Sequence, residues 1–140
     1  MKRKTTRSLI IIIVLALMLP TVAFATMEAS QYLSYYDAYI TNTGNTIKVN
    51  FVVQGTRIMD KIGATEIYLY EKTSSAGSWT LVQTYLSTDS AYASDMMNSN
   101  ASFKDDYVSY SGNSSYQYKA YVTVYAEKDG GSDSRSIIAN

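Results

Sequence analysis

The chain has 140 residues with no cysteine and no histidine, and its 12 basic and 12 acidic residues give a formal net charge of zero. The lack of these two residue types excludes disulfides, Ser-His-Asp and Cys-His catalytic schemes, and zinc sites of the usual ligand types.

The first 25 residues have the pattern of a secretory signal. Four basic residues lie among the first seven positions and precede an uninterrupted apolar run over residues 9–19, which Pro20 ends. Ala23 and Ala25 supply the small residues that signal peptidase requires. The apolar run is too short to span a bilayer, which takes about 20 residues. We therefore expect residues 1–25 to be cleaved and residues 26–140 to be secreted as a single extracellular domain.

Cleavage changes the charge of the protein. The four basic residues of the signal leave with it, so that eight basic residues face 12 acidic ones and the net charge becomes −4. A mildly acidic domain has no electrostatic reason to bind nucleic acid or an anionic membrane. Without cysteine there is also no lipidated anchor, and we expect no membrane association after cleavage.

Two strands are predicted in the first part of the mature chain. Residues 32–41 contain four Tyr and one Ile and indicate an edge strand. A turn at residues 42–45 ends it, because Gly and Asn tolerate positive φ. Residues 54–63 are expected to form a connection. In residues 47–53 the apolar side chains alternate with others, and this period predicts a strand with one buried face, made of Ile47, Val49, Phe51 and Val53.

Three more strands follow. Residues 64–72 predict a third strand with Ile67 and Leu69 on its inner face, and a hairpin-type loop connects it to a fourth at residues 79–86. Residues 87–100 indicate a loop with one helical turn, since Asp89 or Ser90 could cap such a turn. A fifth strand is predicted at residues 101–110.

The clearest strand pattern is that of residues 116–126. A tight turn at residues 129–131 leads from this sixth strand to a seventh at residues 132–138. Seven short strands without a long helix predict an all-β fold, an immunoglobulin-like antiparallel sandwich. Period two gives the sixth strand an inner face made of Tyr116, Tyr118, Ala120, Val122, Val124 and Ala126.

The stretch from Tyr110 to Tyr116 resembles the entry to strand F of fibronectin type III domains. This resemblance implies that Tyr116 is the structural corner tyrosine, whose hydroxyl bonds back to the backbone of the turn at residues 111–115. Phe51 stands where that family usually has tryptophan. With its stretches 59–63 and 118–122, the chain looks like a family of short secreted proteins of unknown function from Gram-positive bacteria. This likeness implies export and fold, and no activity.

The carboxylates do not form a pattern typical of catalysis or metal binding. Asp105 and Asp106 are neighbours on a predicted strand, so their side chains point to opposite faces and cannot act on one substrate. Asp129 and Asp133 flank a Gly-Gly pair, which is typical of a hairpin turn, whereas an EF-hand calcium loop needs more oxygen ligands in a fixed order. We expect no enzyme, no cofactor and no metal site.

Tyrosine is the unusual feature of the composition, with 14 residues against one Trp and three Phe. If the third and sixth strands are neighbours, their outer faces bring together four of these, and Tyr85 or Trp79 extends the row. Such a face suits contact with sugar rings or with a protein, because Tyr offers a large contact area at low entropic cost. Alternatively, cross-strand aromatic pairs simply stabilise the sheet. The four tyrosines of this candidate ligand face are Tyr68, Tyr70, Tyr121 and Tyr125.

Two functions are consistent with these features. The first is a secreted, non-catalytic binding or interaction module, whose tyrosine-rich sheet face contacts an envelope glycan or another exported protein. The alternative is a self-associating structural protein of an extracellular matrix or envelope. Proline, which blunts the edges of sheets, does not occur after Pro20.

Overall fold

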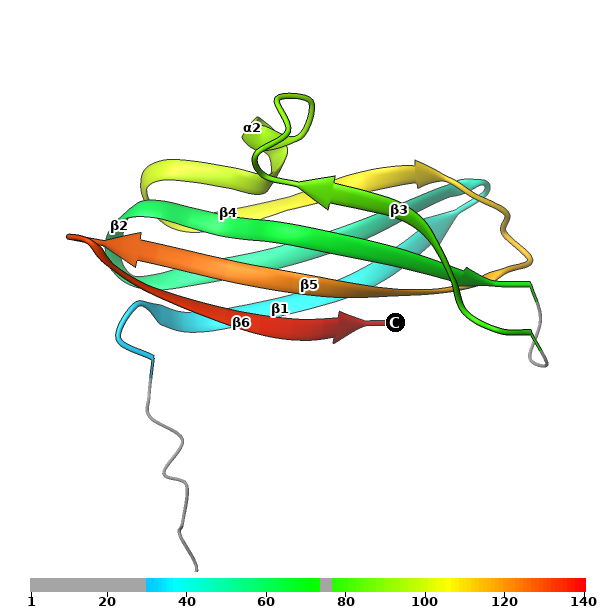
Figure 1. The fold of residues 1–140 in the computed structure, drawn as a ribbon, viewed down its shortest axis with the longest axis horizontal. Helices are drawn as coiled ribbons and strands as arrows, with labels where there is room; N and C mark the ends of the chain where they lie inside the picture. The colour runs from blue at the N-terminus through cyan, green and yellow to red at the C-terminus, as the bar shows by residue number, and fades with distance from the viewer. Residues whose placement is uncertain (1–29, 74–76) are drawn as a thin grey trace, which may run out of the picture.

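The computed structural model describes residues 30–73 and 77–140, and this part of the chain is all-β apart from one short helix (Figure 1). Its six strands form one antiparallel sheet that curls around the core. The elements are β1 (Leu33–Thr43), β2 (Thr46–Lys72), β3 (Thr80–Leu86), α2 (Ala93–Met96), β4 (Met97–Ser111), β5 (Gln117–Lys128) and β6 (Gly131–Ala139).

The 27-residue strand β2 connects the two halves of the sheet. Its first half, residues 46–55, lies between β1 and β4. Its second half, residues 61–72, pairs with β5 throughout and with β3 over residues 66–71, and β6 lies outside β5. Residues 61–63 pair with both β4 and β5, so the chain passes from one half to the other without leaving the sheet.

The continuity of β2 corrects the prediction of a separate connection at residues 54–63. The second and third predicted strands are one strand, and the described residues therefore form six strands instead of seven. The physical reason is burial and pairing across the expected break. Met59 and Ile62 are fully buried, and a register shift after Gln54 lets pairing with β4 resume at Met59 and Ala101.

Gly63 allows the backbones of β2 and β4 to approach closely at the point where β2 passes from one half of the sheet to the other. Its φ of 154° is a conformation that L side chains rarely adopt. A Cβ at this position would overlap the carbonyl oxygen of Met96 and lie 3.0 Å from the Cα of Met97. Since both neighbours are backbone atoms, they cannot move aside as a side chain could.

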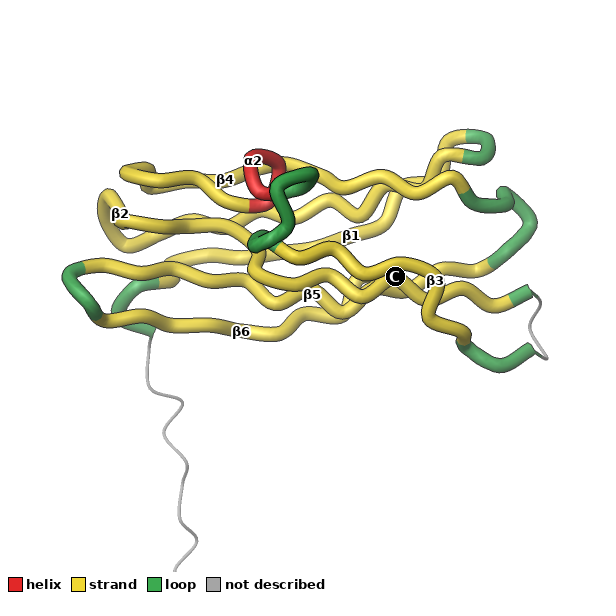
Figure 2. The backbone as a smooth tube through the Cα atoms, turned by 45° about the horizontal axis from the view of Figure 1, so that its top comes forward, coloured by secondary structure: helices red, strands yellow, loops and turns green. Residues whose placement is uncertain are grey.

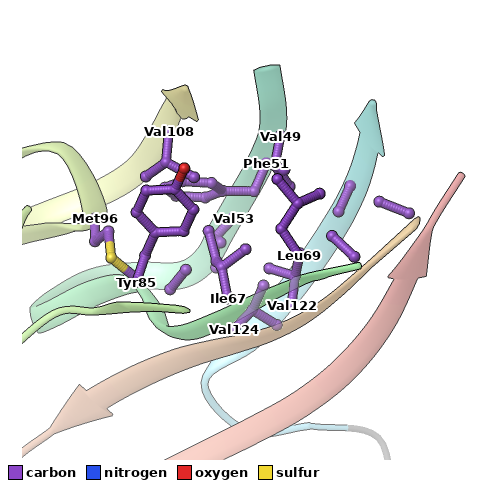
Figure 3. Close-up of a cluster of buried hydrophobic side chains, with 14 of the residues drawn as sticks. Val49, Phe51, Val53, Ile67, Leu69, Tyr85, Met96, Val108, Val122 and Val124 are labelled. Atoms are coloured by element: carbon purple, nitrogen blue, oxygen red, sulfur yellow. The ribbon is translucent and has the colours of Figure 1, made fainter. Parts of the chain in front are cut away.

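The inner faces of the strands follow the predicted alternation. The four predicted core residues of the first half of β2 are buried, as are Ile67 and Leu69 in its second half. On β5, residues 118, 120, 122, 124 and 126 are buried too. Figure 3 shows Val49, Phe51 and Val53 meeting side chains of the other half across the core, among them Ile67, Leu69, Val122 and Val124.

The resemblance implied that Tyr116 makes the corner hydrogen bond, but Tyr118 makes it instead. The buried Tyr118 hydroxyl accepts a hydrogen bond from the Asn113 N–H (2.7 Å) and donates one to the Asn113 carbonyl (3.2 Å). Tyr116 contributes its backbone N–H, which donates to the same carbonyl at 3.0 Å. Both tyrosines have the same strand parity, so alternation alone does not distinguish them. Gly112 leaves room for the Tyr118 ring, because a Cβ there would overlap its hydroxyl.

The helical turn expected within residues 87–100 is present as α2, which lies beside β4 at one edge of the molecule (Figure 2). The four residues of α2 place Met96 in the core. Strand β4 begins directly afterwards at Met97, four residues earlier than predicted.

Gly63→Ala should be strongly destabilising. The positive φ costs about 1–3 kcal/mol for a residue with a side chain, and the overlap with backbone costs about 1–3 kcal/mol more. Gly44→Ala is the matched control, because Gly44 has a φ of 63° but no atom within 4 Å of the new Cβ. It should cost about 1–2 kcal/mol. Urea unfolding followed by circular dichroism measures both variants. Equal losses in the free energy of unfolding would contradict a close approach of the backbones at Gly63.

Tyr118→Phe should cost about 1–3 kcal/mol in the free energy of unfolding, since it leaves the Asn113 N–H without its partner. Tyr116→Phe should change it by no more than about 0.5 kcal/mol, because no hydrogen bond to its hydroxyl occurs among the described residues. Parallel urea melts decide between the two positions. A larger loss at Tyr116 would restore the corner role to that residue.

Candidate functional site

The structure brings three of the four predicted tyrosines together on the outer side of β2 and β5. Tyr68 is the register partner of Tyr121. The rings of Tyr70 and Tyr121 contact each other edge to face, with centroids 5.6 Å apart and an interplanar angle of 81°. Tyr121 is 38% exposed, while Tyr68 and Tyr70 are half-buried. This arrangement follows from the two-residue period of strands, because all three tyrosines alternate with buried residues of the same strands.

Tyr125 lies apart from this group. It is the register partner of Gly63, four residues along β5 from Tyr121, which corresponds to about 13 Å. Its hydroxyl donates to a carboxylate oxygen of Glu127 at 2.6 Å, and this bond, together with burial, raises the pKa of Tyr125. The Tyr125 hydroxyl is thus already bonded to Glu127, and the half-buried ring is not part of the candidate site.

Trp79 extends the group, as one of the two predicted alternatives, and two lysines join it through contacts that the strand pattern did not reveal. The Lys119 ammonium lies 4.5 Å from the ring centroid of Trp79, and 5.7 and 5.6 Å from those of Tyr70 and Tyr121. Lys72 lies 4.9 Å from the Trp79 ring. These distances are within the range of cation–π attraction, about 6 Å. Alternation placed Lys119 and Lys72 on the outer face, but their contact with Trp79 depends on the path of the chain into β3.

Exposed aliphatic side chains border the group on both sides. Leu81 of β3 is the register partner of Tyr70, and Ile138 of β6 is the partner of Tyr121. Both are exposed, so the patch reaches across four strands. We call it the tyrosine face and define it as Tyr68, Tyr70, Lys72, Trp79, Leu81, Lys119, Tyr121 and Ile138.

Tyr85 does not extend the tyrosine face, although the sequence allowed it to. It is the register partner of Ile67 and points into the core, where its hydroxyl donates to the Ser109 carbonyl at 2.8 Å. Burial, followed by the neighbouring Tyr92 and Tyr110, raises the pKa of Tyr85 to about 12. This tyrosine therefore connects β3 to β4 through the interior (Figure 3).

The adjacent Asp105 and Asp106 lie on opposite faces, as the strand period predicted. Asp105 pairs in register with Val52, while Asp106 pairs with the buried Phe51. Asp106 accepts a hydrogen bond from Lys104 at 2.9 Å. The two carboxylates cannot act as a catalytic pair in this geometry.

Lys104 is the one buried charged residue in the described part of the chain, with 5% of its surface exposed. Besides its ion pair with Asp106, its ammonium donates to the Ser94 carbonyl of α2 at 2.8 Å. A terminal carbonyl of a helix needs such a partner. The interactions therefore attach α2 to β4. An open cleft of about 310 Å³ lies beside this contact, lined by Ala91, Tyr92, Asp95, Asp106, Tyr107, Val108 and Ser109.

The turn that carries Asp129 is structural. Asp129 and Gly130 both have positive φ, 53° and 80°, as the two central residues of a type I′ hairpin turn do. Asp60 of β2 accepts hydrogen bonds from the Lys128 ammonium (2.7 Å) and the Asp129 N–H (2.9 Å). Asp133 instead pairs with Arg135. Within residues 30–73 and 77–140, no three His, Cys, Asp or Glu side chains form a group that could hold a metal ion.

None of the helices in the described residues has the length and apolar character needed to cross a membrane. In comparisons with known proteins, no family model, no curated protein and no solved structure matches this chain.

Asp60→Asn tests the link between β2 and the hairpin turn. The hydrogen bonds from Lys128 and the Asp129 N–H lower the pKa of Asp60. A lowered pKa means that the carboxylate stabilises the fold above its unfolded pKa of about 3.9, and that this contribution is lost as the pH falls through the folded value. At pH 7 the variant should therefore be less stable than the wild type. Below about pH 4 the difference should narrow.

The matched control is Asp105→Asn, because Asp105 is exposed and has no ion pair or hydrogen bond with any other described residue. Its free energy of unfolding at pH 7 should stay close to that of the wild type. Urea melts across the acidic range compare the three proteins. A loss in Asp60→Asn that is constant with pH would contradict the charged role of Asp60.

Proposed function

We propose that this protein is a secreted, non-catalytic binding module that contacts an envelope glycan or another exported protein through its tyrosine face. The observation that carries the proposal is the separation of the two sides of the sheet. Mostly aliphatic inner residues fill the core, yet the outer side presents an apolar patch across four strands with aromatic rings at its centre. Outer faces of antiparallel sheets are usually polar, and a concentrated apolar patch is typical of an interaction site.

The basic side chains of the patch favour a partner with negative charge. Neither Lys72 nor Lys119 forms an ion pair within the part of the chain that the structure describes. Both ammonium groups instead lie over aromatic rings. An anionic glycan or an acidic protein surface would therefore meet stacked rings and uncompensated positive charge together.

The proposal includes secretion of the protein and an immunoglobulin-like fold. The signal pattern of residues 1–25 supports secretion. An immunoglobulin-like sandwich of the fibronectin type III kind is supported by two groups of strands that face each other over one core, and by a tyrosine that bonds back to the preceding turn. Residues 59–63 and 118–122 support membership of the short secreted Gram-positive family that the sequence resembles.

The double substitution Tyr68→Ser plus Tyr121→Ser should weaken binding to the envelope fraction by at least about tenfold. Truncating a central aromatic residue of an interface commonly costs more than 1–2 kcal/mol, and about 1.4 kcal/mol corresponds to a factor of ten. The measurement is a pull-down from the culture envelope, followed by a glycan array that separates a carbohydrate ligand from a protein one.

The control carries the same change on the other side of the molecule, Tyr35→Ser plus Tyr39→Ser, and in dilute protein it should bind as the wild type does. Circular dichroism and urea melts confirm that both variants are folded. If the folded Tyr68 and Tyr121 variant retains every interaction at wild-type strength, the tyrosine face is not the contact surface.

A further inference from the structure

The opposite side of the molecule carries a second aromatic patch, on the outer surface of β1, the first half of β2 and β4. The register places Tyr35, Gln54 and Phe103 in one row across these strands. A second row, two residues along each strand pair, contains Asp37, Val52 and Asp105. We call this patch the acidic face and define it as Tyr35, Asp37, Tyr39, Phe103, Asp105 and Tyr107.

The acidic face is open to solvent. Its four aromatic residues are each between 43% and 52% exposed, which is more than Tyr121 on the tyrosine face. Tyr39 and Tyr107 lie on either side of Asn50 in a third row. The aromatic rings therefore stand in two rows with the carboxylates between them.

The two carboxylates of the acidic face have oxygens available to a partner, although one oxygen of Asp37 accepts the Ala38 N–H at 2.8 Å. Asp37 and Asp105 both have Val52 as register partner, from opposite sides, so their backbones lie two strand spacings apart, about 10 Å. No ion pair involving either one occurs among the described residues. Lys48 lies 3.9 Å above the Tyr107 ring at a corner of the patch.

The two faces complement each other. Both are aromatic, but the tyrosine face contributes the ammonium groups of Lys72 and Lys119, whereas the acidic face contributes the carboxylates of Asp37 and Asp105. Charge complementarity of this kind selects a partner and fixes its orientation. We infer that the occupant of the acidic face is the tyrosine face of a second copy of this chain. The inference rests on the proposed function, since it takes the tyrosine face as a contact surface and names one partner for it.

The position of the faces determines the kind of assembly. Inner residues of both halves belong to the same core, so the two outer faces point away from each other. A contact between unlike faces leaves the pair with one free tyrosine face at one end and one free acidic face at the other. Such heterologous contacts build open chains unless the rotation closes a ring. Each patch is only about 10–15 Å wide across its strands, which is small for a stable interface. We expect a weak contact that grows with concentration and weakens with salt.

Two charge reversals test the inference on the mature protein. The first variant, Asp37→Lys plus Asp105→Lys, loses the acidic face and keeps the tyrosine face. The second, Lys72→Glu plus Lys119→Glu, does the reverse. In sedimentation velocity at low salt, the wild type should form larger species as its concentration rises, and added salt should reverse this. Each variant alone should stay monomeric.

An equimolar mixture of the two variants is the decisive sample. The intact acidic face of the second variant can dock on the intact tyrosine face of the first, and the two reversed faces are again opposite in charge. The mixture should therefore associate, although each variant alone does not. A wild type that is monomeric throughout would overturn the inference. Association of the first variant with itself would overturn it too, because it would indicate pairing through like faces or sheet edges.

The same variants separate this inference from the proposed function. The first variant keeps the tyrosine face and should bind the envelope fraction as the wild type does. If self-association is absent while Tyr68→Ser plus Tyr121→Ser still abolishes envelope binding, only the inference of a second copy fails. If both tyrosine-face variants bind the envelope normally, the proposed function fails independently of the oligomeric state.

Discussion

The close approach of β2 to the start of β4 at Gly63 joins the two halves of the sheet. At this point the β2 backbone pairs with β4 on one side and with β5 on the other. One strand thereby belongs to both halves of the sheet, and its inner residues line the core from both sides. A side chain at residue 63 would force the backbone of Met96 away, and with it α2 and the beginning of β4.

The passage of β2 between the two halves of the sheet also determines which surfaces the protein presents. Because both halves direct their aliphatic residues inward, every second residue of each strand points outward, and the outward set is rich in tyrosine. Tyrosine serves in both environments. In the core, Tyr85 and Tyr118 satisfy their hydroxyls with backbone groups. Outside, Tyr121 leaves its ring available for contact. The same residue type therefore supports stability and offers binding surface.

Alternation in the sequence was enough to predict the inner and outer faces. Ile47 to Val53 and the residues of β5 lie on the predicted faces, and Tyr68, Tyr70 and Tyr121 lie together because parity and strand neighbours together determine their positions. The continuity of β2 could not be predicted in this way. Residues 54–63 lack a regular period, and their strand conformation depends on pairing with β4, which is distant in the sequence.

The features that the sequence did not reveal depend on register between strands. Tyr116 and Tyr118 share a parity, so that only the length of the turn decides which hydroxyl reaches Asn113. Asp37 and Asp105 are far apart in the chain, and the register places them on either side of Val52. The position of Trp79 beside Lys119 likewise depends on how the chain enters β3.

Tyrosine-resolved chemical labelling of the mature protein, free and bound to the envelope fraction, measures whether the tyrosine face is the contact surface. In the free protein, the exposed Tyr121, Tyr35 and Tyr39 should react readily, while the buried Tyr85 and Tyr118 should not. On binding in dilute protein, where copies do not associate, Tyr121 should lose its reactivity, and Tyr35 and Tyr39 should keep theirs. Undiminished reactivity of Tyr121 in the bound protein would show that the tyrosine face is not the contact surface.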